Sequence, residues 1–395
     1  MNLLLMAHGQ AVIEKNIVTE NYIYIEDGKI QEIGPLSEMP ARYLDAEKIE
    51  VSEDQIVVPG FIDGHIHGAA GADTMDATKE ALTTIAGALP AEGTTSFLAT
   101  TMTQKPESIE RALVNVADYC KNHNDPGKAE ILGIHLEGPF ISKKRKGAQP
   151  EEYILNPDIE LFRKWQNLAD GGIKLVTCAP ELKNALDFIH YLNEHGVIAS
   201  IGHTDAVYED VKKAVQAGAK RVTHLFNGMR GIHHREPGTA AAAILFKELM
   251  VELIVDGIHL NPEIVRLVLN TKGADGVVLI TDAMRAKCLK NGIYDLGGQD
   301  VSVADGKALL ADGTLAGSIL KMNESFKNTV EFAQVSLLEA VQMASVNPAK
   351  QLNIFDRKGS LTVGKDADLT VLSADYRVEI TICRGEIAYQ GDRAV

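Results

Sequence analysis

The chain has 395 residues, which at about 150 residues per domain suggests two or three domains, although one α/β barrel can take up about 250 of them. Its 39 lysine and arginine residues stand against 54 aspartate and glutamate residues, and the resulting net charge of −15 opposes the basic surface that nucleic acids require of a partner. A hydrophobic content of 45% with 24% charged residues is typical of globular proteins, so a disordered, collagen-like or coiled-coil chain is excluded.

The two ends of the chain are predicted to form short strands separated by turns. Near the N-terminus, Ile23–Ile25 and Ile30–Ile33 flank a turn at 26–29, which indicates a β-hairpin. Neither end alone has enough strands to bury a sheet face, so we expect residues 1–55 and 359–395 to combine into one discontinuous β-sandwich domain. The strands predicted near the C-terminus are Ser360–Val363, Asp368–Leu372, Val378–Cys383 and Ile387–Tyr389.

Residues 56–358 alternate apolar runs rich in strand formers with amphipathic stretches, the pattern of βα units and a parallel sheet. Helices are predicted over Glu181–His195 and Asp205–Ala217, the second ended by Gly218. Eight such units predict a (β/α)₈ TIM barrel. The alternative, a doubly wound open sheet, lacks a GxGxxG motif after its first strand. The predicted barrel strands are Val57–His67, Thr94–Thr100, Glu130–Pro139, Ile173–Pro180, Val197–Thr204, Arg221–Asn227, Met250–His259 and Val277–Ala283.

The four cysteines lie far apart in the sequence and form no CxxC pair. We therefore expect neither a disulfide framework nor a thiolate zinc site, and a cytoplasmic location. The apolar run Leu3–Ala7 has no basic segment before it and no cleavage pattern after it. Because no apolar stretch approaches the about 18 residues of a membrane-spanning helix, no membrane partner is expected.

The first pointer to chemistry lies at the end of the first barrel strand, where His65 and His67 form an HxH motif. Alternate residues of a strand share a face, and in a barrel the shared face is the interior. The motif alone is weak, because the twelve histidines of the chain give roughly 0.4 HxH pairs by chance. Its place at a strand end is more informative than the motif itself.

Four other predicted strands also end with a residue type that binds metals. The carboxyl ends of barrel strands are where catalytic residues converge. Together with the HxH pair, these residues supply six nitrogen and oxygen donors, which suit one or two divalent ions such as zinc or iron. For any one of them the alternative is an ordinary hydrogen-bonded polar residue at a strand end. The four residues are Glu137, His203, His224 and Asp282.

Longer motifs carry a family resemblance. VPGFIDGHIH at 58–67 resembles the opening strand of the amidohydrolase superfamily, and GSLTVGKDADLTVL at 359–372 resembles its closing β-segment. Within the superfamily the chain is similar to the deacetylases of N-acetylglucosamine 6-phosphate, over nearly its whole length. The motifs that carry this similarity are HLEGPF (135–140), GHTDA (202–206), THLFNGM (223–229), HREPG (234–238), DGIH (256–259), ITDAM (280–284) and GTLAGS (313–318).

The resemblance implies a β-sandwich joined to a barrel, and the hydrolysis of N-acetylglucosamine 6-phosphate to glucosamine 6-phosphate and acetate in amino-sugar catabolism. It implies that Glu137, His203 and His224 hold the main catalytic ion. His65 and His67 would hold a second ion, bridged to the first by the two oxygens of Glu137. Some members of the family lack one histidine of the HxH motif and carry a single metal. This chain keeps both, so we expect a site able to hold two ions, zinc or iron.

Asp282 is implied to be the general base and acid. It would take a proton from the attacking water and deliver it to the departing amine, which cannot leave as an anion. A purely structural carboxylate at the strand end is the alternative for this residue.

Phosphate binding by a chain of charge −15 requires a local group of cations. The resemblance implies that Arg235 reaches the phosphate with Asn227 and the Gly228 backbone, from its own subunit or from the neighbouring subunit of a homodimer. The lysine and arginine run 143–146, Lys143 to Lys146, is either a further substrate contact or a solvated loop. The residues implied to bind the sugar and acetyl groups are Ala148, Asp256, His259, Leu315, Ala316 and Gly317.

Some features stay open. Phe226 and Gly228 stand where the family more usually has Tyr and Ala, and His233 and His234 fit a surface loop at least as well as a site role. Two alternative functions also remain. One is another amidohydrolase activity, such as a deaminase or a deacetylase of a different acetylated amino sugar. The other is a catalytically silent scaffold built on the same fold.

Overall fold

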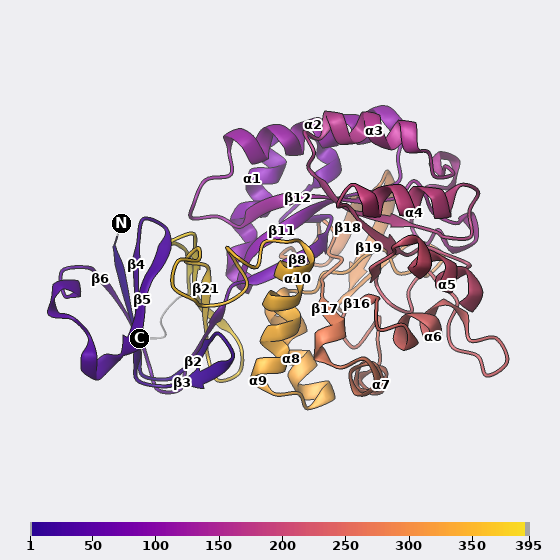
Figure 1. Cartoon of the computed structure of the whole chain (residues 1–395). Helices are drawn as coiled ribbons and strands as arrows, with labels where there is room; N and C mark the ends of the chain where they lie inside the picture. The colour runs from indigo at the N-terminus through magenta and orange to yellow at the C-terminus, as the bar shows by residue number, and fades with distance from the viewer. Residues whose placement is uncertain (1, 392–395) are drawn as a thin grey trace.

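The computed structural model describes residues 2–391, and its largest part is a parallel barrel (Figure 1). Eight strands follow one another in chain order, each hydrogen-bonded to the next. The last strand returns to the first, because the amide of Asp282 donates to the carbonyl of His65 at 2.8 Å. The predicted TIM barrel is confirmed. Its strands are β8 (Phe61–Ile66), β11 (Thr94–Thr101), β12 (Glu130–Glu137), β13 (Ile173–Cys178), β14 (Ile198–Ile201), β15 (Arg221–Val222), β16 (Met250–Leu253) and β17 (Val277–Leu279).

Helices cover the outside of the barrel (Figure 1), and the apolar faces of helices such as that at 106–122 join the barrel's core cluster. The predicted helix after β14 begins three residues later than expected, at Tyr208, and ends as predicted where Gly218 takes a left-handed φ of 111°. Within residues 2–391, no helix has both the length and the apolar character needed to cross a membrane. The helices are α1 (Lys79–Ala88), α2 (Pro106–Asn122), α3 (Ile159–Leu168), α4 (Ala185–Glu194), α5 (Tyr208–Ala217), α6 (Gly238–Leu245), α7 (Pro262–Lys272), α8 (Met322–Ala333), α9 (Leu337–Val341) and α10 (Asn347–Gln351).

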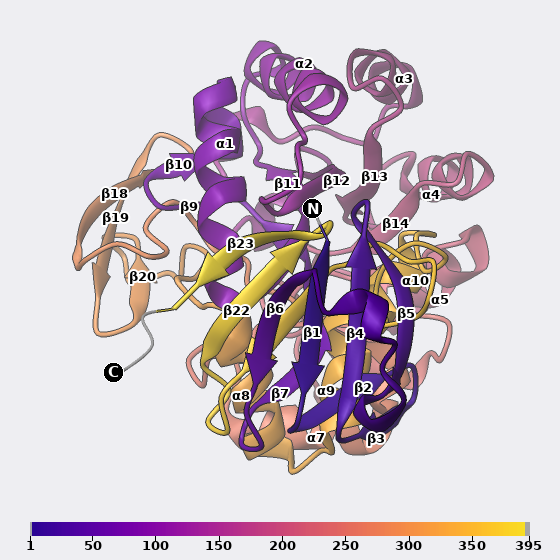
Figure 2. The same cartoon turned by 90° about the vertical axis from the view of Figure 1, so that its left-hand side faces the viewer.

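The two ends of the chain together build a second, sheet-rich part beside the barrel (Figure 2). One sheet has the order β5-β4-β1-β6, and the other has the order β23-β22-β21-β7-β2-β3, so the second mixes strands from both termini. Residues such as Ile23, Val57 and Val371 form one apolar cluster shared by the two sheets. The strands are β1 (Leu3–Ala7), β2 (Gln10–Ile13), β3 (Asn16–Val18), β4 (Asn21–Glu26), β5 (Lys29–Pro35), β6 (Glu47–Val51), β7 (Ile56–Pro59), β21 (Leu369–Leu372), β22 (Val378–Cys383) and β23 (Glu386–Gln390).

The structure corrects two sequence-based strands. The run Val57–His67 is two strands, because β7 pairs with β21 in the terminal sheet and only β8 enters the barrel. Pro59 has no amide hydrogen to continue a ladder, and Gly60 passes so close to Thr95 that an added Cβ would lie 2.2 Å from its Oγ1. The run Ser360–Val363 forms only an isolated bridge between Leu361 and Ile13. We therefore propose Gly60, four residues later than expected, as the start of the barrel domain.

A three-stranded antiparallel sheet follows β17 and was not predicted from the sequence. It consists of β18 (Gly292–Leu296), β19 (Gln299–Ala304) and β20 (Lys307–Leu309). Its buried side packs in a cluster with Met102, Ala148 and Ala316, beside the mouth of the barrel. The signal for it was present, since Gly297-Gly298 and Asp305-Gly306 are two-residue turns between alternating sequences.

Candidate metal centre

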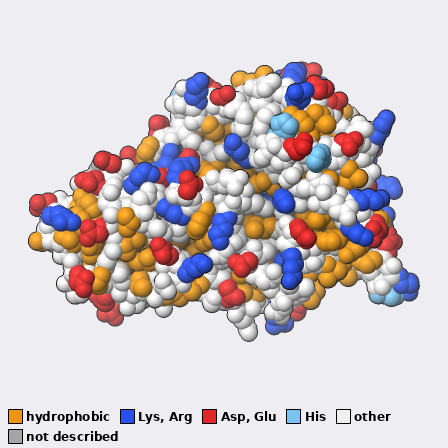
Figure 3. All heavy atoms as spheres, in the orientation of Figure 1, with side chains coloured by type: hydrophobic (Ala, Val, Ile, Leu, Met, Phe, Trp, Pro, Cys, Tyr) orange, Lys and Arg blue, Asp and Glu red, His pale blue; other side chains and the backbone are white. Residues whose placement is uncertain are grey.

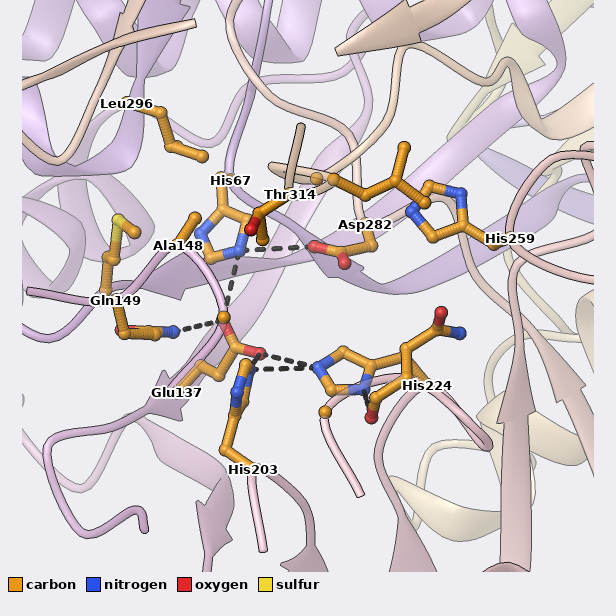
Figure 4. A pocket seen from close by; sticks show the side chains of 16 residues that line it. His67, Glu137, Ala148, Gln149, His203, His224, His259, Asp282, Leu296 and Thr314 are labelled. Carbon is orange, nitrogen blue, oxygen red and sulfur yellow. Dashed lines mark hydrogen bonds and ion pairs between the residues drawn. The ribbon is translucent and has the colours of Figure 1, made fainter. Parts of the chain in front are cut away.

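The six donors predicted at the strand ends converge at the carboxyl end of the barrel. Figure 4 shows all of them except His65. They form two groups of three, and within each group the donor atoms lie within 4.8 Å of one another. All six residues are buried, and the most exposed of them, His203 and Asp282, are only 8% exposed. The two groups are His65 with His67 and Asp282, and Glu137 with His203 and His224.

Glu137 lies between the two groups. Its Oε1 is 3.1 Å from Nε2 of His203, 3.2 Å from Nε2 of His224 and 3.5 Å from Nε2 of His65. Its Oε2 is 3.1 Å from Nε2 of His67. One carboxylate therefore presents an oxygen to the histidines of both groups, the arrangement that a ligand shared by two cations needs.

The outer nitrogens of the histidines fix the direction of their lone pairs. Nδ1 of His203 donates to the carbonyl of Arg145 at 2.8 Å, and Nδ1 of His224 donates to the carbonyl of Asn227 at 3.1 Å. A carbonyl oxygen only accepts, so each Nδ1 carries a proton and each neutral ring has its lone pair on Nε2. These two Nε2 atoms lie 3.1 Å apart. Two lone pairs that face each other and a carboxylate repel unless a cation lies among them, so the donor set fits a metal ion.

The charges of the cluster also favour a cation among the donors. Burial lowers the pKa of His67, but the carboxylates of Asp282 and Glu137 outweigh burial and raise that pKa to about 10. For the acid Glu137 burial has the opposite effect and raises the pKa. The surrounding imidazoles, His65 foremost, outweigh burial and hold the pKa of Glu137 well below its usual range. Groups that so strongly favour a positive charge among them also favour a divalent ion, which displaces the protons on binding.

Backbone strain marks the strand ends that carry three of the donors. His203, His224 and Asp282 have left-handed φ values of 46°, 30° and 48°. Non-glycine residues in this region cost of order 1–3 kcal/mol each and persist where the surrounding structure fixes them, typically at functional sites.

A cavity of about 190 Å³ opens over the donors. Of the residues predicted to bind substrate, six line it: Ala148, Asn227, Gly228, His259, Leu315 and Gly317. The structure does not bring the other three to the cavity wall. Ala316 is fully buried in the cluster under the three-stranded sheet, Asp256 accepts a 2.6 Å hydrogen bond from His259, and Arg235 lies on an exposed loop with His233 and His234.

Several cavity residues were missed by the sequence reasoning. Gln149 donates to Oε2 of Glu137 at 3.1 Å, and its own side-chain oxygen accepts from the amide of Thr103 at 2.7 Å. Its signal was its position next to Ala148, which the resemblance had singled out. The other missed lining residues are Met102, Gly147, Leu296 and Thr314. Thr314 belongs to the GTLAGS motif at 313–318, whereas the segments around the other three give no chemical pattern.

The basic run Lys143–Lys146 does not line the cavity. Its Arg145 forms a 3.0 Å ion pair with Asp205, and the Arg145 carbonyl is the acceptor that orients His203. This loop therefore supports a metal-ligand candidate through its backbone.

Comparisons with known proteins agree with this geometry. The model of the amidohydrolase family matches residues 56–388. The chain is 50% identical over 379 residues to N-acetylglucosamine-6-phosphate deacetylase of Bacillus subtilis (96% of this chain, 95% of that one), and 45% identical over 372 residues to the enzyme of that name from Lysinibacillus sphaericus (93% of each). A variant of N-acetyl-D-glucosamine-6-phosphate deacetylase from Mycobacterium smegmatis, solved with N-acetyl-D-glucosamine-6-phosphate, superposes with a TM-score of 0.90 at 33% identity over 99% of each chain.

Proposed function

Since this chain belongs to the amidohydrolase family, we infer that it is a metal-dependent hydrolase that removes the acetyl group from N-acetylglucosamine 6-phosphate, giving glucosamine 6-phosphate and acetate. The observation that carries this function is the convergence of Glu137, Asp282 and the Nε2 atoms of four histidines at the end of the barrel where the cavity opens. A silent scaffold of the same fold would not need six buried donors held in this arrangement. The activity is tested by acetate release from the phosphorylated sugar.

Glu137, His203 and His224 are proposed to hold one divalent ion, and His65 and His67 a second one, with Glu137 shared. Nitrogen and carboxylate donors suit zinc or iron equally. A bound divalent ion supplies a Lewis acid, which polarises the amide carbonyl and lowers the pKa of a water molecule. Metal analysis by mass spectrometry of the purified protein decides between the two metals and gives their number per chain.

Asp282 is proposed to move the proton. Its Oδ1 lies 3.3 Å from Nε2 of His67, and its side chain lines the cavity. Burial raises the pKa of Asp282, but His65 and His67 outweigh burial and keep that pKa below its usual range. The carboxylate is therefore ionised at neutral pH and able to act as a base. The proton it takes from water is then given to the amine nitrogen, which leaves protonated.

His259, which lines the cavity, is proposed to contact the sugar or acetyl group. Its Nδ1 donates to Oδ2 of Asp256, and Asp256 also accepts from the backbone amides of Ile258 and His259. Asp256 therefore orients His259 and is proposed to support substrate binding in this indirect way.

Removal of the metal is expected to lower both activity and stability. A ligand that binds only the folded state, at a free concentration of 100 times its Kd, adds about 2.7 kcal/mol to the free energy of unfolding. We expect the chelated protein to stay folded but to unfold at a lower temperature. Added Zn²⁺ should restore both the original unfolding temperature and the turnover. Calorimetry with and without Zn²⁺ measures this. Full activity of metal-free protein would contradict the mechanism.

Arg235→Ala is expected to raise KM for the phosphorylated substrate by roughly 10- to 100-fold, the value of a hydrogen bond to a charged group, and to leave kcat nearly unchanged. Hydrolysis of unphosphorylated N-acetylglucosamine is expected not to change. Arg266→Ala, which removes an exposed arginine from α7, is the matched control. An equal loss on both sugars, or no loss on either, would contradict a phosphate contact and favour another amino-sugar substrate.

A homodimer in which Arg235 serves the neighbouring site is part of the same proposal, because Arg235 is exposed and absent from its own cavity wall. Mixed dimers of Arg235→Ala and Asp282→Asn subunits test it. One site of such a dimer pairs an intact Asp282 with an intact Arg235 from across the interface, so at a substrate concentration well below the KM of the Arg235→Ala protein, activity should rise on mixing above the sum of the two parent homodimers. If it does not, Arg235 acts within its own subunit or not at all.

The compartment is proposed to be the cytoplasm. All four cysteines are free thiols in the structure, and two of them, Cys178 and Cys383, are buried.

A further inference from the structure

Glu252 is a buried carboxylate on β16 that contacts both groups of metal-ligand candidates. Its side chain is 0% exposed. Oε2 of Glu252 lies 2.9 Å from Nδ1 of His65 and also accepts a hydrogen bond from the backbone amide of His224 at 3.0 Å. His65 belongs to one group and His224 to the other, so one oxygen atom joins the two.

Arg221 holds this carboxylate in place from below. Its Nε donates to Oε1 of Glu252 at 2.7 Å, and neither side chain is exposed. Nη1 of Arg221 donates to Gln351 on α10 at 2.7 Å. A Cβ added to Gly64 would lie 2.9 Å from Nη2, so the glycine before His65 leaves room for the guanidinium. The guanidinium is therefore held through Nε by Glu252 and through Nη1 by Gln351.

The hydrogen bond from His65 sets its tautomer. An ionised carboxylate only accepts, so Nδ1 of His65 carries a proton, and Nε2 is the nitrogen whose lone pair a metal ion can take once any proton on it is displaced. That Nε2 atom has no hydrogen-bond partner within the described residues and faces Oδ1 of Asp282 at 3.4 Å and Oε1 of Glu137 at 3.5 Å. The orphaned atom is the one a metal ion would need.

We propose that Glu252, anchored by Arg221, is a positioning residue that fixes the tautomer of His65 and the backbone of His224, and so couples the two ion sites. This inference rests on the proposed metal centre. Carboxylates that orient metal-binding histidines in this way typically change metal affinity by about 10- to 100-fold when they are removed. The role is additional to the roles assigned to the six donors.

Glu252→Gln is the first test. Arg221 is a donor, so the side-chain oxygen of the glutamine would stay with it. The side-chain NH₂ group would then face Nδ1 of His65 and the backbone N–H of His224, both of which are donors and cannot accept a hydrogen bond from it. Nδ1 of His65 would then have to accept, and its proton would move to Nε2. We expect Zn²⁺ affinity, measured by chelator competition, to fall by about 10- to 100-fold. Glu92→Gln, which disrupts the buried pair between Glu92 and Lys287, is the control and should not change that affinity.

Two double variants separate positioning from simple loss of a buried ion pair. Arg221→Met with Glu252→Gln and Arg221→Met with Glu252→Met both remove the buried charges, which is often neutral for stability. Only the glutamine variant keeps an acceptor for His65 and for the His224 amide. We expect it to bind Zn²⁺ nearly as the unmodified protein does, and the methionine variant to bind about 10- to 100-fold more weakly.

Thermal unfolding of both double variants in chelator checks that each is folded. Equal Zn²⁺ affinity of the two would overturn the positioning role, while the proposed function would stand as long as the unmodified protein binds metal and releases acetate. Absence of both metal and acetate release in the unmodified protein would instead overturn the proposed function itself.

Discussion

Asp282→Asn is expected to lower kcat for acetate release by about 10²- to 10⁴-fold, the range for loss of a general acid–base group. Asparagine has nearly the same shape and retains a carbonyl oxygen near His65 and His67, but it cannot take a proton from water or return one to the amine. The backbone around it should persist, since the Asp282 amide and carbonyl are bonded to His65 and Ser318, each at 2.8 Å.

The measurement has three parts. Acetate release gives kcat, mass spectrometry gives the metal content, and calorimetry gives the unfolding temperature. We expect only the first to change strongly. Turnover close to that of the unmodified protein would eliminate Asp282 as the proton carrier. A parallel loss of metal would show that this carboxylate acts mainly as a ligand.

The donor set could be predicted because the geometry of a barrel determines where the ends of its strands lie. Strands that run parallel around a closed sheet bring their carboxyl ends to one face whatever the loops do. Glu137, His203, His224 and Asp282 needed only to be recognised as strand ends, and the structure places all of them with the HxH pair. Their backbone strain and their hydrogen-bond partners depend on the conformation of the loops, so they could not be predicted from the sequence.

The support behind the donors could not be predicted in the same way. Glu252 and Arg221 lie on strands whose sequence indicates burial, and a charged residue there gives no direction for its side chain. Their pairing depends on the register between β15 and β16 and on Gln351 at the far end of the chain. A charged residue inside an apolar strand was the available signal, because burial of a charge requires a partner.

The fold shows a similar division between local and distant information. Each barrel strand has its own apolar run, so local sequence was sufficient. The split at Gly60 depends on pairing between β7 and β21, more than 300 residues later in the chain, which no local pattern reports. The position of Arg235 depends on an exposed loop, so the sequence leaves open whether this arginine would reach a phosphate in its own subunit or in a neighbouring one.

Glu137→Gln is expected to have an effect as large as that of Asp282→Asn, through loss of metal instead of loss of a proton carrier. Glu137 is the only described donor that contacts His65, His67, His203 and His224. A glutamine keeps one oxygen but places an NH₂ group where the other oxygen faced a histidine. It also removes the negative charge that the two groups of donors share. A divalent ion contributes several kcal/mol to the transition state, which corresponds to about 10³-fold in rate or more.

We therefore expect Glu137→Gln to bind less than one ion per chain and to lose at least about 10³-fold in kcat/KM, with only partial recovery in excess Zn²⁺. Glu110→Gln is the matched control, since Glu110 is a carboxylate on α2 that contacts Lys164 and Trp165, away from the donors. Its metal content and turnover should not change. If Glu137→Gln kept two ions, Glu137 could not be the bridge, and each group of donors would have to hold its ion independently. In that case the coupling proposed through Glu252 would still link the two sites.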